Sequence, residues 1–261
     1  MTLNYVKKFL QKNLIYQIHK PLPKIKYRQK ILSSGIDKLW QADLIDLKKN
    51  HKRKKDIKTF GFNYILCCID IFSKFSLVEP IRNKSANSVL KAFGTIIKRA
   101  KLYNHNTPER LHTDKGTEFF NKKLYMFFKN NNIYHYSTEG LHKAANCERF
   151  NRTLMTKLQK IYSYKYNKIK RAKQYKSLLQ AIVNAYNNKK SRTHGYAPIK
   201  VNKENTDIVW NKLYGEYFKK TPRIIHFMLG DNVLVSKRKT GFTKGYKSNY
   251  LKKKLKFMIF H

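Results

Sequence analysis

Residues 64–81 read YILCCIDIFSKFSLVEPI, and this stretch decides the fold. The run 64–72 is almost continuously apolar and rich in β-branched residues, which is typical of a strand buried on both faces of a sheet. After a turn at Ser73-Lys74, residues 75–81 can pair beside it as a second strand. An apolar-rich segment with two aspartates, residues 40–47, precedes both. The sequence therefore predicts a sheet that begins with three antiparallel strands.

The rest of the core pattern alternates between helices and strands. Apolar residues recur at helical spacing between residues 86 and 100, behind Ser85 as a helix cap. Further segments predict a strand, a helix, a strand and two helices, in this order, at residues 110–113, 119–130, 133–136, 145–162 and 175–188. The element order βββαβαβα, with one more helix to complete it, predicts an α/β domain.

Charge is the strongest signal in the composition. The 261 residues include 57 Lys and Arg against 15 Asp and Glu, which gives a formal net charge of +42. A chain this basic repels itself unless a polyanion neutralises it, so nucleic acid is the expected partner. A hydrophobic content of 41% and an aromatic content of 14% exclude a wholly disordered basic tail. Charge alone does not separate an enzyme from a ribosomal or packaging protein.

The cysteines and histidines limit the setting and the metal chemistry. Cys67, Cys68 and Cys147 form no CxxC pair, no secretory signal is recognisable, and no apolar run approaches the roughly 20 residues of a membrane span. We therefore expect a reducing, intracellular setting. Because His19 is the only histidine before His51, the first part of the chain cannot assemble a four-ligand zinc site.

Composition divides the chain into four parts. Residues 1–36 carry eight basic and no acidic side chains and include two prolines, which predicts an extended basic arm, with a solvated linker as the alternative. Residues 37–202 hold the predicted α/β domain, and residues 203–222 are expected to be a linker. Residues 223–261 predict a small basic β module, because a turn feeds a strand and nine Lys or Arg occur between positions 237 and 256.

Carboxylates embedded in apolar segments are the candidates for chemistry, because a chain this basic has few of them. Five qualify: Asp43, Asp46, Asp70, Asp114 and Glu148. Asp114 follows a predicted strand, so its side chain projects from a strand end where ligands commonly bind, although an ordinary turn aspartate shares this position. Glu148 shares a helical face with positions 151, 152 and 155, although the helix macrodipole also favours glutamate in a first turn.

Three blocks of the sequence match one known pattern. They are WQADLID at residues 40–46, HTDKGTEFFN at residues 112–121 and KAANCERFNRTL at residues 143–154. Together they resemble the catalytic core of the retroviral-type DDE integrases, a family shared by retroviruses, gypsy-type retrotransposons and self-synthesising DNA transposons. The first block aligns Asp43, rather than Asp46, with the family's first metal-binding aspartate. The other two align Asp114 with the second ligand and Glu148 with the third.

The resemblance implies a fold, an activity and a cofactor. The implied fold is a ribonuclease-H-like core, a mixed five-stranded sheet flanked by helices, with a small basic β-barrel or chromo-like C-terminal module. Asp43, Asp114 and Glu148 are then the catalytic and metal-binding residues, and they hold two Mg²⁺ or Mn²⁺ ions. The implied activity is 3′-end processing and strand transfer of mobile-element or viral DNA into target DNA. Joining two DNA ends together implies a homo-multimer, a tetramer, located in the nucleus of a eukaryote or in a viral particle.

Basic and polar residues near these blocks and in two lysine-rich segments are the predicted contacts to double-stranded DNA. Asn151 and Arg152 match positions that contact DNA in relatives, and Lys115 directly follows the second aspartate. Seven basic residues lie between positions 48 and 58, and such clusters hold phosphate backbones without discriminating sequence. The predicted contacts in the two segments are Lys52, Arg53, Lys54, Lys237, Arg238 and Lys239.

Three alternative functions stay open at this point. The first is a domesticated or decayed integrase-derived protein that binds DNA without catalysis. The second is an RNA-binding protein of the ribosomal kind, for which metal-independent binding of folded RNA would be the sign. The third is a true ribonuclease H, whose fourth carboxylate has no clear counterpart in this sequence.

Overall fold

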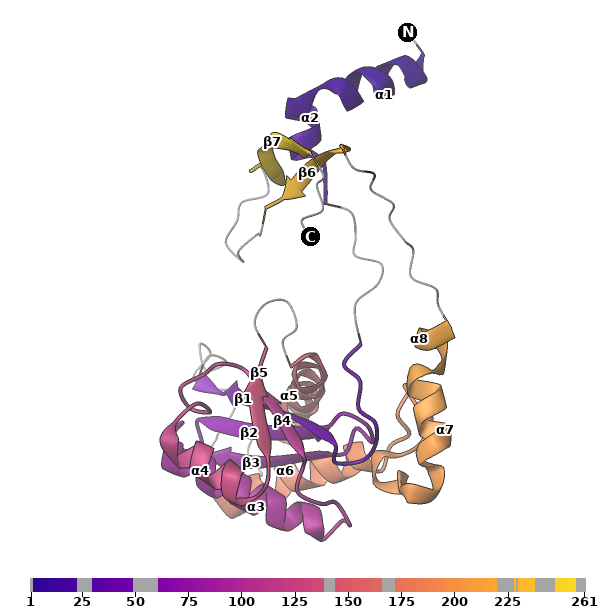
Figure 1. Cartoon of the computed structure of the whole chain (residues 1–261). Helices are drawn as coiled ribbons and strands as arrows, with labels where there is room; N and C mark the ends of the chain where they lie inside the picture. The colour runs from indigo at the N-terminus through magenta and orange to yellow at the C-terminus, as the bar shows by residue number, and fades with distance from the viewer. Residues whose placement is uncertain are drawn as a thin grey trace. The chain divides into compact units, whose positions relative to one another are not determined.

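The computed structural model describes residues 2–22, 30–48, 61–138, 144–165, 172–219, 228, 230–237 and 247–256. The chain forms two compact units (Figure 1). The larger unit is Ile31–Lys220, and the smaller unit combines Met1–Lys30 with Thr221–His261. The larger unit therefore extends beyond the predicted domain, residues 37–202, at both ends.

A mixed five-stranded sheet forms the centre of the larger unit, in the order β3-β2-β1-β4-β5. The strands are β1 Leu39–Asp46, β2 Tyr64–Asp70, β3 Ser76–Ile81, β4 Arg110–Thr113 and β5 Tyr134–Ser137. The first three pair with one another in antiparallel fashion, whereas β4 pairs in parallel with β1 and β5 pairs in parallel with β4. The predicted antiparallel start and the mixed sheet are both confirmed.

Helices cover both faces of this sheet (Figure 1). They are α3 Ala86–Lys101, α4 Lys122–Asn130, α5 Ala145–Lys165 and α6 Ala172–Asn187. Side chains alternate between the faces of a strand, so Cys68 packs in the core beneath α3 and α4 whereas Cys67 packs in the core beneath α5 and α6. The predicted cap of the first core helix is confirmed, because the Ser85 side chain accepts a hydrogen bond from the backbone N–H of Ser88.

Side chains cover the outer edge of strand β3. Asn187 at the end of α6 accepts a hydrogen bond from the backbone N–H of Ser76 at 3.0 Å and donates one to its carbonyl at 2.9 Å. The carbonyl of Val78 accepts hydrogen bonds from Arg99 of α3 at 2.7 Å and from Gln180 of α6 at 3.1 Å. An uncovered edge strand would offer these groups to other chains. The helices thus protect β3 from strand-to-strand association.

The predicted linker, residues 203–222, is wrong as far as the structure describes it, because this segment is helical up to residue 219. After a 3-10 helix at Pro198–Lys200 come a 3-10 helix Lys203–Asn205, α7 Thr206–Trp210, a π-helix Asn211–Gly215 and α8 Glu216–Lys219. Val209, Leu213 and Tyr214 are buried in a cluster with Phe72. These apolar residues recur at helical spacing. Their burial stabilises helices in this segment, although the residues between them are polar.

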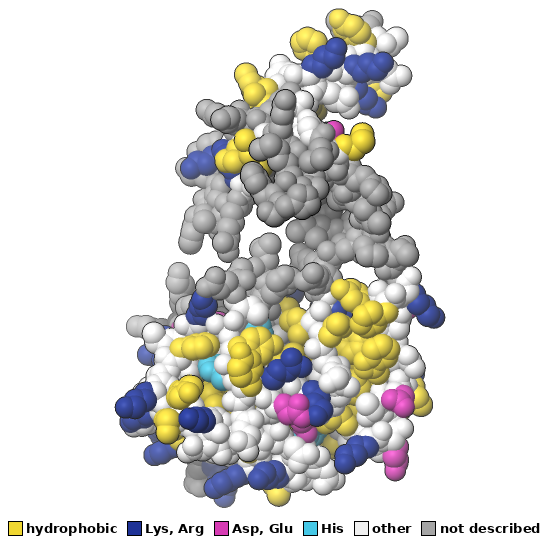
Figure 2. All heavy atoms as spheres, viewed as in Figure 1, with side chains coloured by type: hydrophobic (Ala, Val, Ile, Leu, Met, Phe, Trp, Pro, Cys, Tyr) yellow, Lys and Arg dark blue, Asp and Glu magenta, His cyan; other side chains and the backbone are white. Residues whose placement is uncertain are grey.

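Hydrophobic side chains also gather around α7 and α8 on the face that Figure 2 shows. Trp210 and Phe218 stack with their ring centroids 5.6 Å apart. Ile208 and Phe218 are 50% and 58% exposed.

Among the helices that the structure describes, none has both the length and the apolarity to cross a membrane.

The smaller unit corrects the prediction of an extended arm over residues 1–36. Two helices, α1 Leu3–Lys12 and α2 Leu14–His19, occupy its first part. Pro21 follows α2, so this proline marks the end of helical structure rather than an extended start. The structure also places Ile31 and the residues after it in the larger unit.

The N-terminal helices and the C-terminal strands belong together. Strands β6 Asn232–Ser236 and β7 Tyr250–Lys256 pair in antiparallel fashion. Asn249 donates its backbone N–H to the carbonyl of Ile18 and its amide to the carbonyls of His19 and Lys20. The described part of the predicted C-terminal module is thus a pair of strands packed on α2, and a complete barrel or chromo-like fold stays a prediction.

Candidate active site

Strand β1 positions Asp43 toward the face of the sheet that α5 covers. Asn151 of α5 donates its side-chain amide to Asp43 Oδ2 at 2.8 Å, and the backbone N–H of Leu44 donates to Oδ1 at 2.8 Å. Asp46, three residues further on, falls on the other face of the strand. Its carboxylate accepts a hydrogen bond from the backbone N–H of Lys48 instead. The structure therefore separates the two aspartates of this block.

The parallel pairing of β1 and β4 brings Asp114 to the same end of the sheet. Gln41 pairs with His112 in this register, so two residues further on Asp43 lies beside Asp114. Asp114 directly follows the last residue of β4 and is exposed. Its Oδ1 accepts the backbone N–H of Gly116 at 3.2 Å, which holds the carboxylate in the turn after the strand.

The buried side chain of Gln41 connects β1 to the two other elements of the site. Its Oε1 accepts the backbone N–H groups of Asn146 at 3.1 Å and Cys147 at 3.3 Å. Its Nε2 lies 3.1 Å from Nδ1 of His112 on β4. These contacts fix the first turn of α5 against the sheet. Glu148 is exposed in this first turn.

The three carboxylates interact electrostatically. Burial raises the pKa of Asp43 from its ordinary 3.8 to about 6, and the negative charges of Asp114 and Glu148 raise the pKa as well. The hydrogen bonds from Leu44 and Asn151 lower it, but less than burial raises it. Like charges held at one sheet end repel each other unless a cation or a proton compensates them. This end of the sheet therefore favours a multivalent cation.

Comparison with protein families agrees with this geometry. Residues 35–140 match the family model described as integrase core domain. This part of the chain belongs to the integrase core domain family. The matched residues contain Asp43 and Asp114 and end before Glu148. The role of Glu148 as the third metal ligand therefore stays a prediction that rests on the third sequence block.

A relative and two solved structures resemble the chain. A transposon-derived protein of Caenorhabditis elegans is 30% identical over 193 residues, which are 73% of this chain and 60% of that protein. The simian T-cell lymphotropic virus intasome, solved in complex with PP2A regulatory subunit B56 gamma, matches over 98% of this chain and 81% of its own, with a TM-score of 0.63 and 14% identity. The HTLV-2 integrase catalytic core in complex with magnesium matches over 62% and 94%, with a TM-score of 0.48 and 16% identity. The fold of the intasome chain confirms the predicted ribonuclease-H-like core.

A second group of titratable side chains lies outside the predicted site of the integrase core. Asp37, Asp70 and His105 are buried, and their ligand atoms all lie within 4.8 Å of one another. In the part of the chain that the structure describes, Asp43, Asp114 and Glu148 do not form a group of this spacing. Asp37 Oδ1 accepts hydrogen bonds from Trp40 Nε1 at 2.9 Å and His105 Nδ1 at 2.7 Å. Asp70 Oδ2 accepts both the backbone N–H and the hydroxyl of Ser73. These carboxylates fasten loops to the sheet, so Asp70 has a structural role.

The predicted DNA contacts are placed in different surroundings. Arg152 and Lys115 are both exposed. Arg152 lies about one helical turn after Glu148, and Lys115 directly follows Asp114. The amide of Asn151 bonds to Asp43, so this residue orients a carboxylate of the integrase core. Lys237 lies in the smaller unit and donates to the hydroxyl of Ser248. The remaining predicted contacts lie outside the described residues: Lys52, Arg53, Lys54, Arg238 and Lys239.

Sequence reasoning missed Gln41 and His112 as positioning residues of the integrase core. Both are buried in strands, and His112 also places its Nε2 3.0 Å from the hydroxyl of Thr138. Polar residues at interior strand positions are uncommon unless hydrogen bonds satisfy them. By this rule, the position of Gln41 between the apolar residues Trp40 and Ala42 could have indicated that its side chain makes buried hydrogen bonds.

Proposed function

We propose that this chain is a DNA integrase that catalyses 3′-end processing and strand transfer of mobile-element or viral DNA into target DNA. The observation that carries the proposal is that strand β1, the turn after β4 and the first turn of α5 bring Asp43, Asp114 and Glu148 to one end of the sheet. The integrase core domain family and the transposon-derived relative support it.

The donor set fits divalent metal ions. Three carboxylates supply hard oxygen ligands, which Mg²⁺ and Mn²⁺ prefer, and their mutual repulsion favours a dication over a monovalent ion. Asp43, Asp114 and Glu148 would hold two such ions. When bound, a pair of ions activates the attacking oxygen and stabilises the leaving oxygen of an in-line phosphoryl displacement.

The chain's own residues have separate tasks in this reaction. The Asn151 amide holds the Asp43 carboxylate in a fixed orientation through a 2.8 Å hydrogen bond. Gln41 ties the start of α5 to β1, which keeps Glu148 at the same sheet end as the aspartates. Arg152 and Lys115 are exposed next to this site, and in this proposal they would hold backbone phosphates of the DNA.

The partner and the assembly follow from the same proposal. The formal charge of +42 suits double-stranded DNA, both element ends and target. We propose a tetramer, because two DNA ends must reach one target together, and a location in the nucleus or in a viral particle. The small basic C-terminal module, with Lys237, is proposed to bind DNA outside the catalytic core.

The test is a joining assay with a labelled element-end duplex, plasmid DNA, and Mg²⁺ or Mn²⁺. We expect the parent chain to produce joined DNA, and Glu148→Gln to lose at least about a thousandfold in rate, since a metal ligand is removed. Asp207→Asn is the matched control, because Asp207 is an exposed carboxylate in the first turn of α7. If the parent chain and both variants bind DNA in a salt-sensitive way but none of them joins it, the result would instead support the decayed, DNA-binding alternative.

A further inference from the structure

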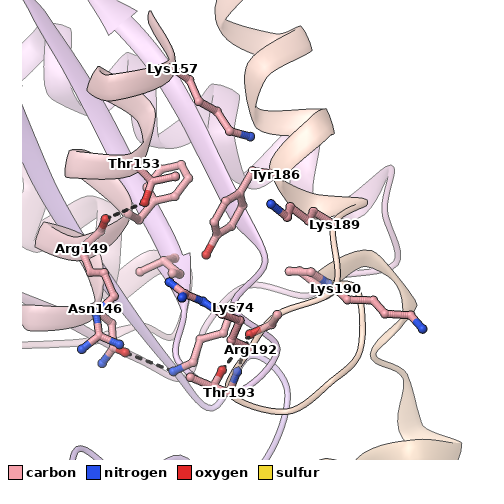
Figure 3. Close-up of a pocket in the computed structure, with 14 residues that line it drawn as sticks. Lys74, Asn146, Arg149, Thr153, Lys157, Tyr186, Lys189, Lys190, Arg192 and Thr193 are labelled. Atoms are coloured by element: carbon pink, nitrogen blue, oxygen red, sulfur yellow. Dashed lines mark hydrogen bonds between the residues drawn. The ribbon is translucent and has the colours of Figure 1, made fainter. Parts of the chain in front are cut away.

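A basic pocket of about 650 Å³ lies between α5, the end of α6 and the turn after β2 (Figure 3). Six of its lining residues are cationic: Lys74, Arg149, Lys157, Lys189, Lys190 and Arg192. No acidic residue is among the lining residues that the structure describes. They come from three segments that are distant in the sequence, so the fold itself assembles this concentration of positive charge.

The pocket is distinct from the carboxylate site, although both use α5. Asn151 faces Asp43. Arg149, Thr153 and Lys157 are spaced four residues apart, so they form another stripe on the same helix, and this stripe lines the pocket. One rigid helix thus presents acidic and basic sites along two of its faces.

The stability of the helices accounts for only some of these cations. Lysines after the C-terminus of α6 interact favourably with its dipole, which would explain Lys189 and Lys190. Arg149 lies near the N-terminal end of α5, where the dipole disfavours a positive charge. Desolvation lowers the pKa of Lys157, and the charge of Lys189 lowers it too. The pocket therefore concentrates mutually repelling charges that an anion would relieve.

Part of the pocket is held in a fixed arrangement. The ammonium of Lys74 donates to the carbonyl of Ile71 at 2.8 Å and to the side-chain oxygen of Asn146 at 3.1 Å. Figure 3 shows Lys74, Arg192 and Thr193 close together at one end of the pocket, with Lys189 and Lys190 on the α6 side. Arg149 and Lys190 are exposed, so a large ligand can reach them.

We propose that this pocket binds phosphate groups of a DNA backbone, as a contact separate from the carboxylate site. Several exposed cations around one fixed ammonium match a polymer of phosphodiesters, which brings successive charges along the pocket. The inference rests on the proposed function only in taking DNA as the polyanion. It requires neither metal ions nor joining activity.

A footprint on the intact chain tests the pocket directly. The protein is acetylated at low reagent concentration in EDTA, with and without a random-sequence duplex of about 40 base pairs, and each lysine is followed by mass spectrometry. We expect DNA to protect Lys189 and Lys190 at least about threefold, and to leave Lys98 and Lys101 reactive, because both of these are exposed on α3 across the sheet. Unprotected pocket lysines would overturn the proposal. Protection by tripolyphosphate but not by DNA would overturn the choice of DNA as the ligand.

Matched charge variants give the second readout. The double variant Arg149→Gln with Lys157→Gln should raise the Kd for the duplex about fivefold, and lower the log-log salt slope by about 0.9 for each lost phosphate contact. The control variant Lys98→Gln with Lys101→Gln removes the same charge from α3. Equal effects of the two variants would refute a local site. Pocket binding without any joining would count against the proposed function alone.

Discussion

Asn187 provides a prediction whose magnitude follows from the structure. Its buried side chain pairs with both the backbone N–H and the carbonyl of Ser76, at 3.0 and 2.9 Å. In Asn187→Ala both groups lose their partner. Each buried backbone group left unsatisfied costs about 1–3 kcal/mol, and water can reach part of an edge strand, so we expect a loss of about 3 kcal/mol in the free energy of unfolding. The melting temperature should fall by about 6–12 °C.

Chemical denaturation and thermal melting, followed by circular dichroism, would measure this loss. Asn188→Ala is the matched control, because Asn188 is exposed and its amide donates to the carbonyl of Asn184 at the same end of the helix. Its free energy of unfolding should change by less than about 0.5 kcal/mol. Equal losses in the two variants would refute the reasoning that α6 protects the edge of β3 through Asn187.

Two further predictions concern Gln41 and Asp70. Gln41→Leu should reduce joining at least about tenfold while DNA binding changes less than twofold, because the anchor of the first turn of α5 is lost; unchanged joining in the plasmid assay would exclude this positioning role. Burial raises the pKa of Asp70 to about 6, so the folded state holds this proton more tightly than the unfolded chain does, and this stabilisation is present below about pH 4 and is lost as the pH rises through about 6. Relative to Asp70→Asn, the parent should therefore lose on the order of 3 kcal/mol of stability across this range in urea titrations, and parallel pH profiles of the two proteins would contradict the assignment.

The sequence predicted the larger unit well where the periodicity was strong. The continuous apolar run 64–72 required a central strand, and the structure buries Leu66 beneath one pair of helices and Cys67 beneath the other. The Trp-Gln block also distinguished Asp43 from Asp46, and the geometry agrees, because the two side chains lie on opposite faces of β1.

Other features depended on contacts that a linear pattern does not contain. The helices after residue 203 are short and rich in Asn and Lys, so apolar residues such as Val209 and Leu213 predict a helix only weakly. Their burial depends on contact with Phe72, which is distant in the sequence. The basic pocket joins Lys74 to Arg192, and only the fold makes these neighbours. The same holds for the contacts that Gln41 makes with α5 and β4.

The most direct test of the central claim compares two aspartates of one strand. Asp43→Asn and Asp46→Asn would be assayed side by side for joining of a pre-processed element end to plasmid DNA in Mg²⁺ and in Mn²⁺, with duplex binding measured in parallel. We predict that Asp43→Asn abolishes joining and retains DNA binding, whereas Asp46→Asn keeps most of the parent's joining rate. Metal-dependent joining that survives in Asp43→Asn would contradict the assignment of Asp43, Asp114 and Glu148 as the catalytic carboxylates.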